Sequence, residues 1–303
     1  MKIKFSVMTD LHTEFIHDAP ERLSAFMRAS KLEKCDFCIE LGDFSPPGEI
    51  HASQKRRIKS MLDSFDLPFY HVLGNHDLDD HTKSRVLAHF GMDKAYYSFD
   101  AGQTHFVVLD ACCFFDNGEA FDYDNGNYRH VKGSAPCIPQ DQLDWLALDL
   151  AGTKYKSVIF SHQSLIESRS SISNADELRA VLSSAPHGVL AAICGHEHVD
   201  RLEKREGIYY YCLNSASYYW SGSAYDHSTY GEELEREYPH LRNIFPYKAP
   251  LFAIIEINEG EMLIRGSAGE FVGATPEELH FKKFGLCDSV TATVKDHRLS
   301  IEE

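Results

Sequence analysis

The 303-residue sequence has no long apolar run. A membrane-spanning helix requires about 18 or more apolar residues in succession, and no segment reaches that length, so we expect no membrane contact. The apolar part of Met1–Asp10 is also too short for a secretory leader and runs directly into a polar motif. These absences predict a cytoplasmic protein, in which the eight cysteines stay as free thiols. The oligomeric state stays open.

Basic charge is scarce. The chain has 30 Lys and Arg against 46 Asp and Glu, which gives a formal net charge of −16. Proteins that bind a nucleic-acid backbone usually carry a basic patch, so a nucleic-acid partner is not expected. An anionic substrate is still compatible with this charge, because bound metal ions supply local positive charge inside an acidic protein.

Apolar runs alternate with helical patterns in the first part of the chain. Short strands are expected at 2–9, 37–41 and 69–73, with helices after Pro20 and over 50–64. Such alternation predicts an α/β fold with parallel pairing. Later strands at 96–99 and 104–109 form a predicted hairpin, so some pairs are antiparallel, and further strands are expected at 157–161 and 189–194. We find no domain boundary and predict a single domain, 1–303. The sequence further predicts two active-site loops and an extended tail: 110–137, 218–248, and from about 269 onward.

Five short polar motifs follow predicted strands. Since ligands bind beyond the carboxyl ends of strands in open α/β sheets, these motifs are expected to converge. They offer carboxylate and amide oxygens and imidazole nitrogens, a donor set that suits Mn, Fe or Zn. In extended backbone, residues two apart point the same way, so both members of Asp-x-His or His-x-His face one ion. The motifs are Asp10-Leu11-His12, Gly42-Asp43, Gly74-Asn75-His76-Asp77, Ser161-His162-Gln163 and Gly195-His196-Glu197-His198.

This order of motifs resembles the calcineurin-like metallophosphoesterase superfamily over roughly residues 5–200. The resemblance implies a four-layer αββα sandwich with two mixed β-sheets and a pair of divalent or trivalent transition-metal ions. It also implies the role of each motif residue. The first ion would be bound by Asp10, His12 and His198, the second by Asn75, His162 and His196, and both by Asp43. His76 would contact the phosphate or the leaving-group oxygen, with Asp77 orienting it.

Phosphate ester hydrolysis fits this donor set. Two ions about 3.5–4 Å apart supply a bridging hydroxide as nucleophile and neutralise the phosphoryl oxygens. A general acid at the leaving group is still useful, and the charge of a histidine such as His76 changes near neutral pH. A carboxylate beside that imidazole, expected from Asp77, fixes its tautomer.

Differences from the motifs of known subfamilies reduce the number of candidate substrate classes. Protein Ser/Thr phosphatases follow Gly-Asp with an Arg-Gly element, which is missing from Gly42-Asp43-Phe44-Ser45-Pro46-Pro47. Purple acid phosphatases have a tyrosine ligand where this chain has Pro46. Cyclic-nucleotide phosphodiesterases often show His-His-Pro-Pro, which Ser161-His162-Gln163-Ser164 matches only in part. We therefore favour a phosphodiesterase acting on a small-molecule or nucleotide-type substrate. The alternatives are a phosphomonoesterase and, from a different class, a non-catalytic scaffold of the same fold.

Two residues outside the motifs are candidates for substrate binding. Arg129 lies in the first predicted loop, where a guanidinium can bind phosphate bidentately; a solvated loop arginine is the alternative. Tyr218 opens the second loop, and its ring could stack on a base or sugar; packing against the sheet is the alternative.

Overall fold

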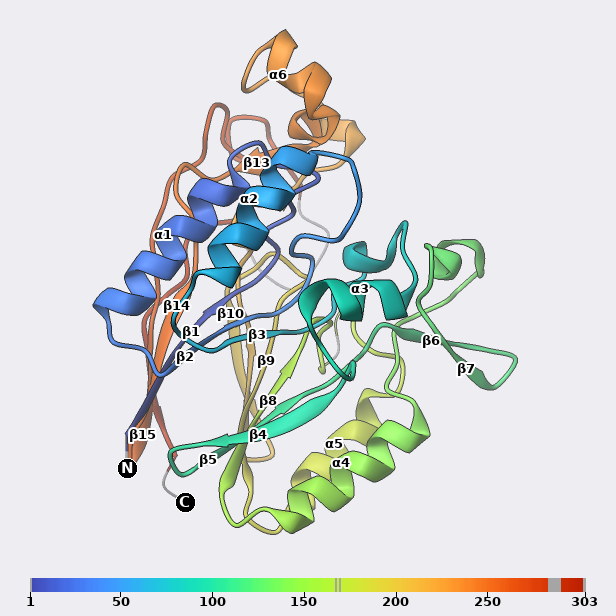
Figure 1. The fold of residues 1–303 in the computed structure, drawn as a ribbon, viewed down its shortest axis with the longest axis vertical. Coiled ribbons are helices and arrows are strands. Elements are labelled where there is room, and N and C mark those ends of the chain that lie inside the picture. The colour runs from blue at the N-terminus through green and yellow to red at the C-terminus, as the bar shows by residue number, and fades with distance from the viewer. Residues whose placement is uncertain (1, 167, 169, 283–289, 302–303) are drawn as a thin grey trace.

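The computed structural model describes residues 2–166, 168, 170–282 and 290–301, which build two six-stranded mixed sheets (Figure 1). In the first sheet the three parallel strands lie together at one edge, and antiparallel strands complete the other half. In the second sheet the four parallel strands lie in the middle, with one antiparallel strand at each edge. The first sheet has the order β16 (His297–Ser300), β15 (Glu261–Arg265), β14 (Ala253–Ile257), β1 (Ile3–Met8), β2 (Phe37–Glu40), β3 (Phe69–His71). The second has the order β10 (Arg201–Arg205), β11 (Ile208–Cys212), β9 (Val189–Cys194), β8 (Lys156–Ser161), β5 (Thr104–Val108), β4 (Tyr97–Ala101).

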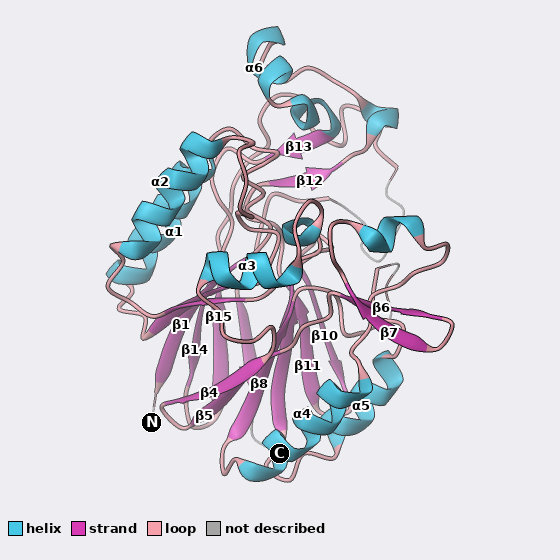
Figure 2. Ribbon diagram, turned by 45° about the vertical axis from the view of Figure 1, so that its right-hand side comes forward, coloured by secondary structure: helices cyan, strands magenta, loops and turns pink. Residues whose placement is uncertain are grey.

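The two sheets pack face to face around an aromatic core. Phe5 of β1 meets Phe106 of β5 edge to face at 5.3 Å and Phe160 of β8 at 5.9 Å between ring centroids. Strands such as β9 are apolar on both faces, because each sheet also carries helices on its outer face. Figure 2 shows the helices on opposite sides of the sheet pair, which confirms the expected four layers: α1 (Ala19–Leu32) and α2 (Ala52–Asp63) on one side, α4 (Gln140–Gly152) and α5 (Ala175–Ser183) on the other. No helix in the described part of the chain is long and apolar enough to cross a membrane.

Short elements gather at the carboxyl end of the parallel strands. The segment 110–137, expected to be irregular, contains a hairpin and a 3-10 turn, and 218–248 contains a two-stranded ribbon. The residues after 269 return to the first sheet, where β16 pairs with β15; residues 283–289 of this tail lie outside the described part. These elements are β6 (Cys113–Asp116), β7 (Glu119–Asp122), η1 (His76–Leu78), η2 (Asn127–His130), α3 (Lys83–Phe90), β12 (Tyr218–Trp220), η3 (Ser223–Tyr225), α6 (Glu232–Glu237), η4 (Pro239–Asn243) and β13 (Ile244–Pro246).

A buried arginine ties this end to the first sheet's helices. Arg22 of α1 is 2% exposed and pairs with Asp18 at 2.7 Å, one turn earlier in the chain. Its guanidinium also donates to the carbonyl oxygens of Ala216 (3.2 Å) and Tyr247 (2.6 Å). Because both carbonyls lie in segments that follow strands, Arg22 fixes the loops that surround the convergent motifs.

Candidate metal centre

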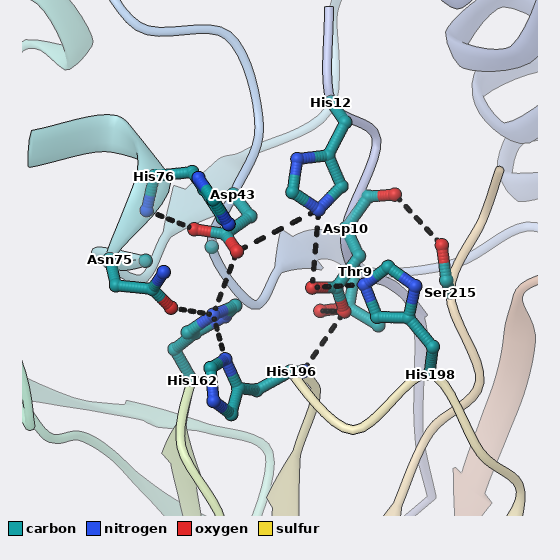
Figure 3. Close-up of polar contacts among 12 residues, drawn as sticks. Thr9, Asp10, His12, Asp43, Asn75, His76, His162, His196, His198 and Ser215 are labelled. Atoms are coloured by element: carbon teal, nitrogen blue, oxygen red, sulfur yellow. Dashed lines mark hydrogen bonds and ion pairs between the residues drawn. The ribbon is translucent and has the colours of Figure 1, made fainter. Parts of the chain in front are cut away.

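The five motifs meet at one place, as Figure 3 shows. Three follow strands of the first sheet, which end at Met8, Glu40 and His71, and two follow strands of the second, which end at Ser161 and Cys194. Parallel strands end at a common edge, so residues from both sheets face each other across the gap between them. The seven side chains expected to bind metal lie in two adjoining groups.

The first group contains Asp10, His12 and His198. Oδ1 of Asp10 lies 3.2 Å from Nε2 of His198 and 3.8 Å from Nε2 of His12. The other carboxylate oxygen, Oδ2, accepts hydrogen bonds from the Thr9 hydroxyl (2.7 Å) and the His196 backbone N–H (3.0 Å). Among the described residues, no donor reaches Oδ1 although it is buried. A buried carboxylate oxygen without a donor but with two imidazole nitrogens near it fits a cation ligand.

The second group is centred on His162. Its Nε2 lies 3.2 Å from Oδ1 of Asn75, 3.1 Å from Nδ1 of His196 and 3.1 Å from Oδ2 of Asp43. Oδ2 of Asp43 also lies 3.7 Å from Nε2 of His12 in the first group. One carboxylate oxygen therefore faces both groups, which is the position that a bridging ligand requires.

Ionisation of these side chains reflects how closely they are packed. Burial opposes charge on Asp43, but His162 and His76 hold the pKa of its carboxyl well below the usual range. Although burial disfavours the imidazolium, Asp43 raises the pKa of His162 to about 10, while burial and His162 lower the pKa of His196 to about 3. A proton on Nε2 of His162 therefore lies among lone pairs of Asp43, His196 and Asn75, which all point toward the same place. A cation at that place would satisfy the same lone pairs.

The backbone at the ligands departs from the extended form expected from the sequence. Asp10, His12, Asp43, His196 and His198 all have φ between 50° and 67°. Left-handed residues other than glycine cost about 1–3 kcal/mol each and persist where the surroundings impose them. The residue pairs of Asp-x-His and His-x-His do face one place, but through tight turns after the strands. A Cβ on Gly195 would lie 1.9 Å from Oγ1 of Thr9, so this turn also requires glycine.

The outer ring nitrogens of three histidines have their own partners. Nδ1 of His162 lies 2.7 Å from the Leu41 carbonyl oxygen and Nδ1 of His198 lies 2.8 Å from that of Tyr218. Nδ1 of His12 lies 3.3 Å from Oε1 of Glu14. Such partners fix the tautomer and leave Nε2 free to bind a metal. Sequence reasoning missed Glu14; the available signal was a carboxylate two positions after a proposed histidine ligand.

The partner predicted for His76 is wrong. Asp77 turns away from His76 and accepts backbone N–H bonds from Asp43 (3.0 Å), Phe44 (3.1 Å) and Gly74 (2.9 Å). Asp79 takes its place, with Oδ2 2.7 Å from Nδ1 of His76. The reason is local: His76 begins the 3-10 helix η1, in which residues three apart lie one above the other. Asp77 instead shapes the loops that carry Asp43 and Asn75.

The two predicted substrate residues lie in different surroundings. Arg129 is half-exposed, lines the cavity above the metal ligands and pairs with Asp79. Tyr218 is 1% exposed, and its ring packs against His12 and His198 with centroid distances of 5.1 and 4.9 Å. Tyr218 therefore lies behind the ligands, whereas Trp220, two residues later, is 44% exposed.

A third group of acidic and thiol side chains already contains a cation. Asp110, Cys113 and Asp122 surround the ammonium of Lys83, whose Nζ lies 2.6 Å from each of the two carboxylates and 3.5 Å from Sγ of Cys113. Burial alone would lower the pKa of Lys83, but Asp110 and Cys113 raise it far above its usual value. This cluster anchors α3 to the β6–β7 hairpin.

The fold and the paired ligand groups define a metallophosphoesterase, and the chain belongs to the calcineurin-like phosphoesterase family, whose model matches residues 3–200. Among curated relatives, tartrate-resistant acid phosphatase type 5 of Mus musculus is 27% identical over 219 residues, and that of Rattus norvegicus 26%. These matches cover 64% of this chain and 65% of each relative, so the chain spans less than two thirds of their length.

Solved structures share the fold. A dimetal phosphatase from Danio rerio aligns with a TM-score of 0.65 and 16% identity, covering 99% of both chains. GAP50, the anchor in the inner membrane complex of Plasmodium, aligns with a TM-score of 0.53 and 14% identity, covering 100% of this chain and 90% of that one.

Proposed function

We propose that the protein is a metal-dependent phosphoric ester hydrolase that uses a pair of transition-metal ions, with Mn, Fe or Zn as the candidates. Membership of the calcineurin-like phosphoesterase family supports the reaction class. The observation that carries the proposal is the position of Asp43 Oδ2, 3.1 Å from Nε2 of His162 and 3.7 Å from Nε2 of His12. Two cations held there would supply Lewis acidity and a water of lowered pKa.

Each residue of the site has a proposed role in metal binding, proton donation or phosphate binding. Asp10, His12 and His198 hold one site, and Asn75, His162 and His196 hold the other, with Asp43 shared between them. His76 is half-buried at the edge of the first group, its ring centroid 5.2 Å from that of His12. In this position its imidazole donates a proton to the departing oxygen, while Asp79 holds Nδ1 and thereby directs Nε2 toward the substrate. Arg129 pairs with the same Asp79 and lines the cavity, which supports its role as a ligand of a phosphoryl oxygen.

Within this class we favour a phosphodiester of a small molecule or nucleotide over a phosphomonoester. The missing Arg-Gly element after Asp43 argues against a phosphoprotein substrate, and the cavity of about 1310 Å³ accepts groups much larger than phosphate. A monoesterase is the second candidate, which the similarity to tartrate-resistant acid phosphatases supports. A non-catalytic scaffold is disfavoured because every ligand position is filled. We retain a single domain over 1–303 and a cytoplasmic location as parts of the proposal.

The test is turnover of p-nitrophenyl phosphate and bis-p-nitrophenyl phosphate by the protein loaded with Mn²⁺, Fe²⁺ or Zn²⁺. A higher kcat/KM for the diester supports a phosphodiesterase. His76→Ala is expected to keep the metal content and to lower kcat roughly 100-fold or more. Full activity in His76→Ala refutes its role as proton donor, and no turnover of any ester with any metal refutes the hydrolase.

A further inference from the structure

Three aromatic side chains, Phe15, His240 and Trp220, form a continuous wall in the cavity above the metal ligands. The ring of Phe15 stacks on His12 at 5.1 Å with an interplanar angle of 3°. His240 follows at 4.2 Å from Phe15, and Trp220 at 5.9 Å from His240. This aromatic wall therefore begins at a metal ligand and runs outward along the cavity.

The outer part of the aromatic wall is open to solvent. Trp220 is 44% exposed and His240 is also exposed, although both line the cavity. A single exposed aromatic side chain on a protein surface needs no explanation. Three aromatic rings in contact, inside a concavity that also holds the convergent polar groups, are typical of a site that binds the apolar part of a ligand.

The aromatic wall lies on the side of the site where the leaving group departs. Phe15 meets His76 edge to face, with a centroid distance of 5.3 Å and an interplanar angle of 71°. Since His76 is proposed to protonate the departing oxygen, the group attached to that oxygen extends past Phe15 toward His240 and Trp220. The part of the substrate that stays on phosphorus lies over the two ligand groups instead.

We propose that the aromatic wall binds a flat, unsaturated ring in the leaving group, so that the preferred substrates are phosphate esters of a nucleoside or a similar ring-bearing alcohol. This inference rests on the proposed hydrolase function. Flat rings gain from offset or edge-to-face contact with aromatic side chains in a way that a sugar alone does not. Such a contact exists in the ground state and in the transition state alike, so its loss raises KM more than it lowers kcat.

Adenosine 5′-monophosphate and ribose 5-phosphate form a matched pair of substrates, because both release a primary 5′ alcohol and only the first carries a base. The same comparison applies to their methyl diesters. The wild-type enzyme is expected to prefer the adenosine esters in kcat/KM, and Trp220→Ala to reduce this preference about tenfold through KM. Trp220→Phe retains a ring and is expected to retain most of the preference. Phe121→Ala, an exposed aromatic on β7 outside the cavity lining, is the control and is expected to keep it.

Fluorescence gives a readout that needs no turnover. The chain has two tryptophans, so Trp145→Phe leaves Trp220 as the sole reporter. Quenching by adenosine 5′-monophosphate at concentrations where ribose 5-phosphate has no effect supports the inference, even if hydrolysis fails and the proposed function falls. Two results overturn the inference: equal quenching by the two compounds, or equal kcat/KM for both with a ratio of kcat/KM values that does not change in Trp220→Ala. Either result is still compatible with the proposed hydrolase function.

Discussion

Oδ2 of Asp79 lies 2.7 Å from Nδ1 of His76, and Oδ1 of the same carboxylate accepts a hydrogen bond from the Tyr128 hydroxyl at 2.6 Å. Asp79 therefore links the proposed proton donor to the loop that also carries Arg129. Asp79→Asn is expected to lower kcat about 10-fold to 100-fold, because the amide no longer fixes the imidazole in its tautomer.

Metal content separates this effect from damage to the metal site. Elemental analysis of Asp79→Asn is expected to match the wild type, since Asp79 contacts none of the proposed ligands by hydrogen bond among the described residues. Asp80→Asn, an exposed neighbour in the same cavity, serves as the control. Unchanged kcat in Asp79→Asn, or an equal loss in Asp80→Asn, contradicts this role.

Glu14 provides a second test, at the other side of His12. Glu14→Gln is expected to weaken binding of the first cation about 10-fold to 100-fold, because a neutral amide replaces the anionic acceptor of the hydrogen bond from Nδ1 of His12. Titration of the apo-protein with Mn²⁺ measures the change, and saturating Mn²⁺ is expected to restore most of kcat. Glu49→Gln, exposed in the same cavity, is the control; equal Mn²⁺ affinity in Glu14→Gln and wild type speaks against the role of Glu14.

Arg22 tests how the loops around the site are held. Arg22→Met removes three hydrogen bonds and leaves the Asp18 carboxylate and the Tyr247 carbonyl oxygen without their donor, whereas the Ala216 carbonyl oxygen keeps the Leu251 N–H. The expected cost is about 3–5 kcal/mol in the free energy of unfolding. Denaturant unfolding measures it, with the exposed Arg28→Met on the same helix as reference. A difference between the two variants below about 1 kcal/mol is incompatible with this account.

His105 makes stability depend on pH. Asp149 raises the pKa of His105 above its usual value, burial opposes this, and Asp100 adds to it. A histidine whose folded pKa is raised stabilises the fold fully below its unfolded pKa of about 6.5, and the stabilisation is lost as pH rises through the folded pKa. His105→Gln is therefore expected to lower the free energy of unfolding more at about pH 6 than at about pH 9. Substitution of the exposed His187 by Gln, measured at the same two pH values, serves as the reference variant. A larger loss for His105→Gln at high pH than at low pH contradicts the assignment.

Much of the fold was accessible from the sequence because buried parallel strands read as apolar runs. β9 (Val189–Cys194) is apolar throughout, and its boundaries were predicted correctly. β10 (Arg201–Arg205) was missed because its five residues are mostly charged, and pairing with β11 creates the strand. The hairpin in 110–137 was missed for a related reason: all four residues of β7 are exposed, so no alternation marks it.

The candidate site, like the fold, was predictable from the sequence only in part. The motif residues were predictable since strand ends converge in α/β sheets, and Asp43 does lie between the two groups. The choice of Asp79 over Asp77 depends on whether the turn after Asn75 is a 3-10 helix, which the sequence does not reveal. The left-handed backbone at Asp10 and His198 was equally hidden, because neither residue is glycine and the conformation is imposed by the packed loops.

The central claim is that Asp43 is shared by two cations. Crystals of the protein soaked in Mn²⁺ and measured at a wavelength where manganese scatters anomalously test it directly. The account predicts two anomalous peaks about 3.5–4 Å apart, one beside Asp10, His12 and His198 and one beside Asn75, His162 and His196, with Asp43 between them. A single peak, or a pair of peaks neither of which contacts Asp43, would contradict it.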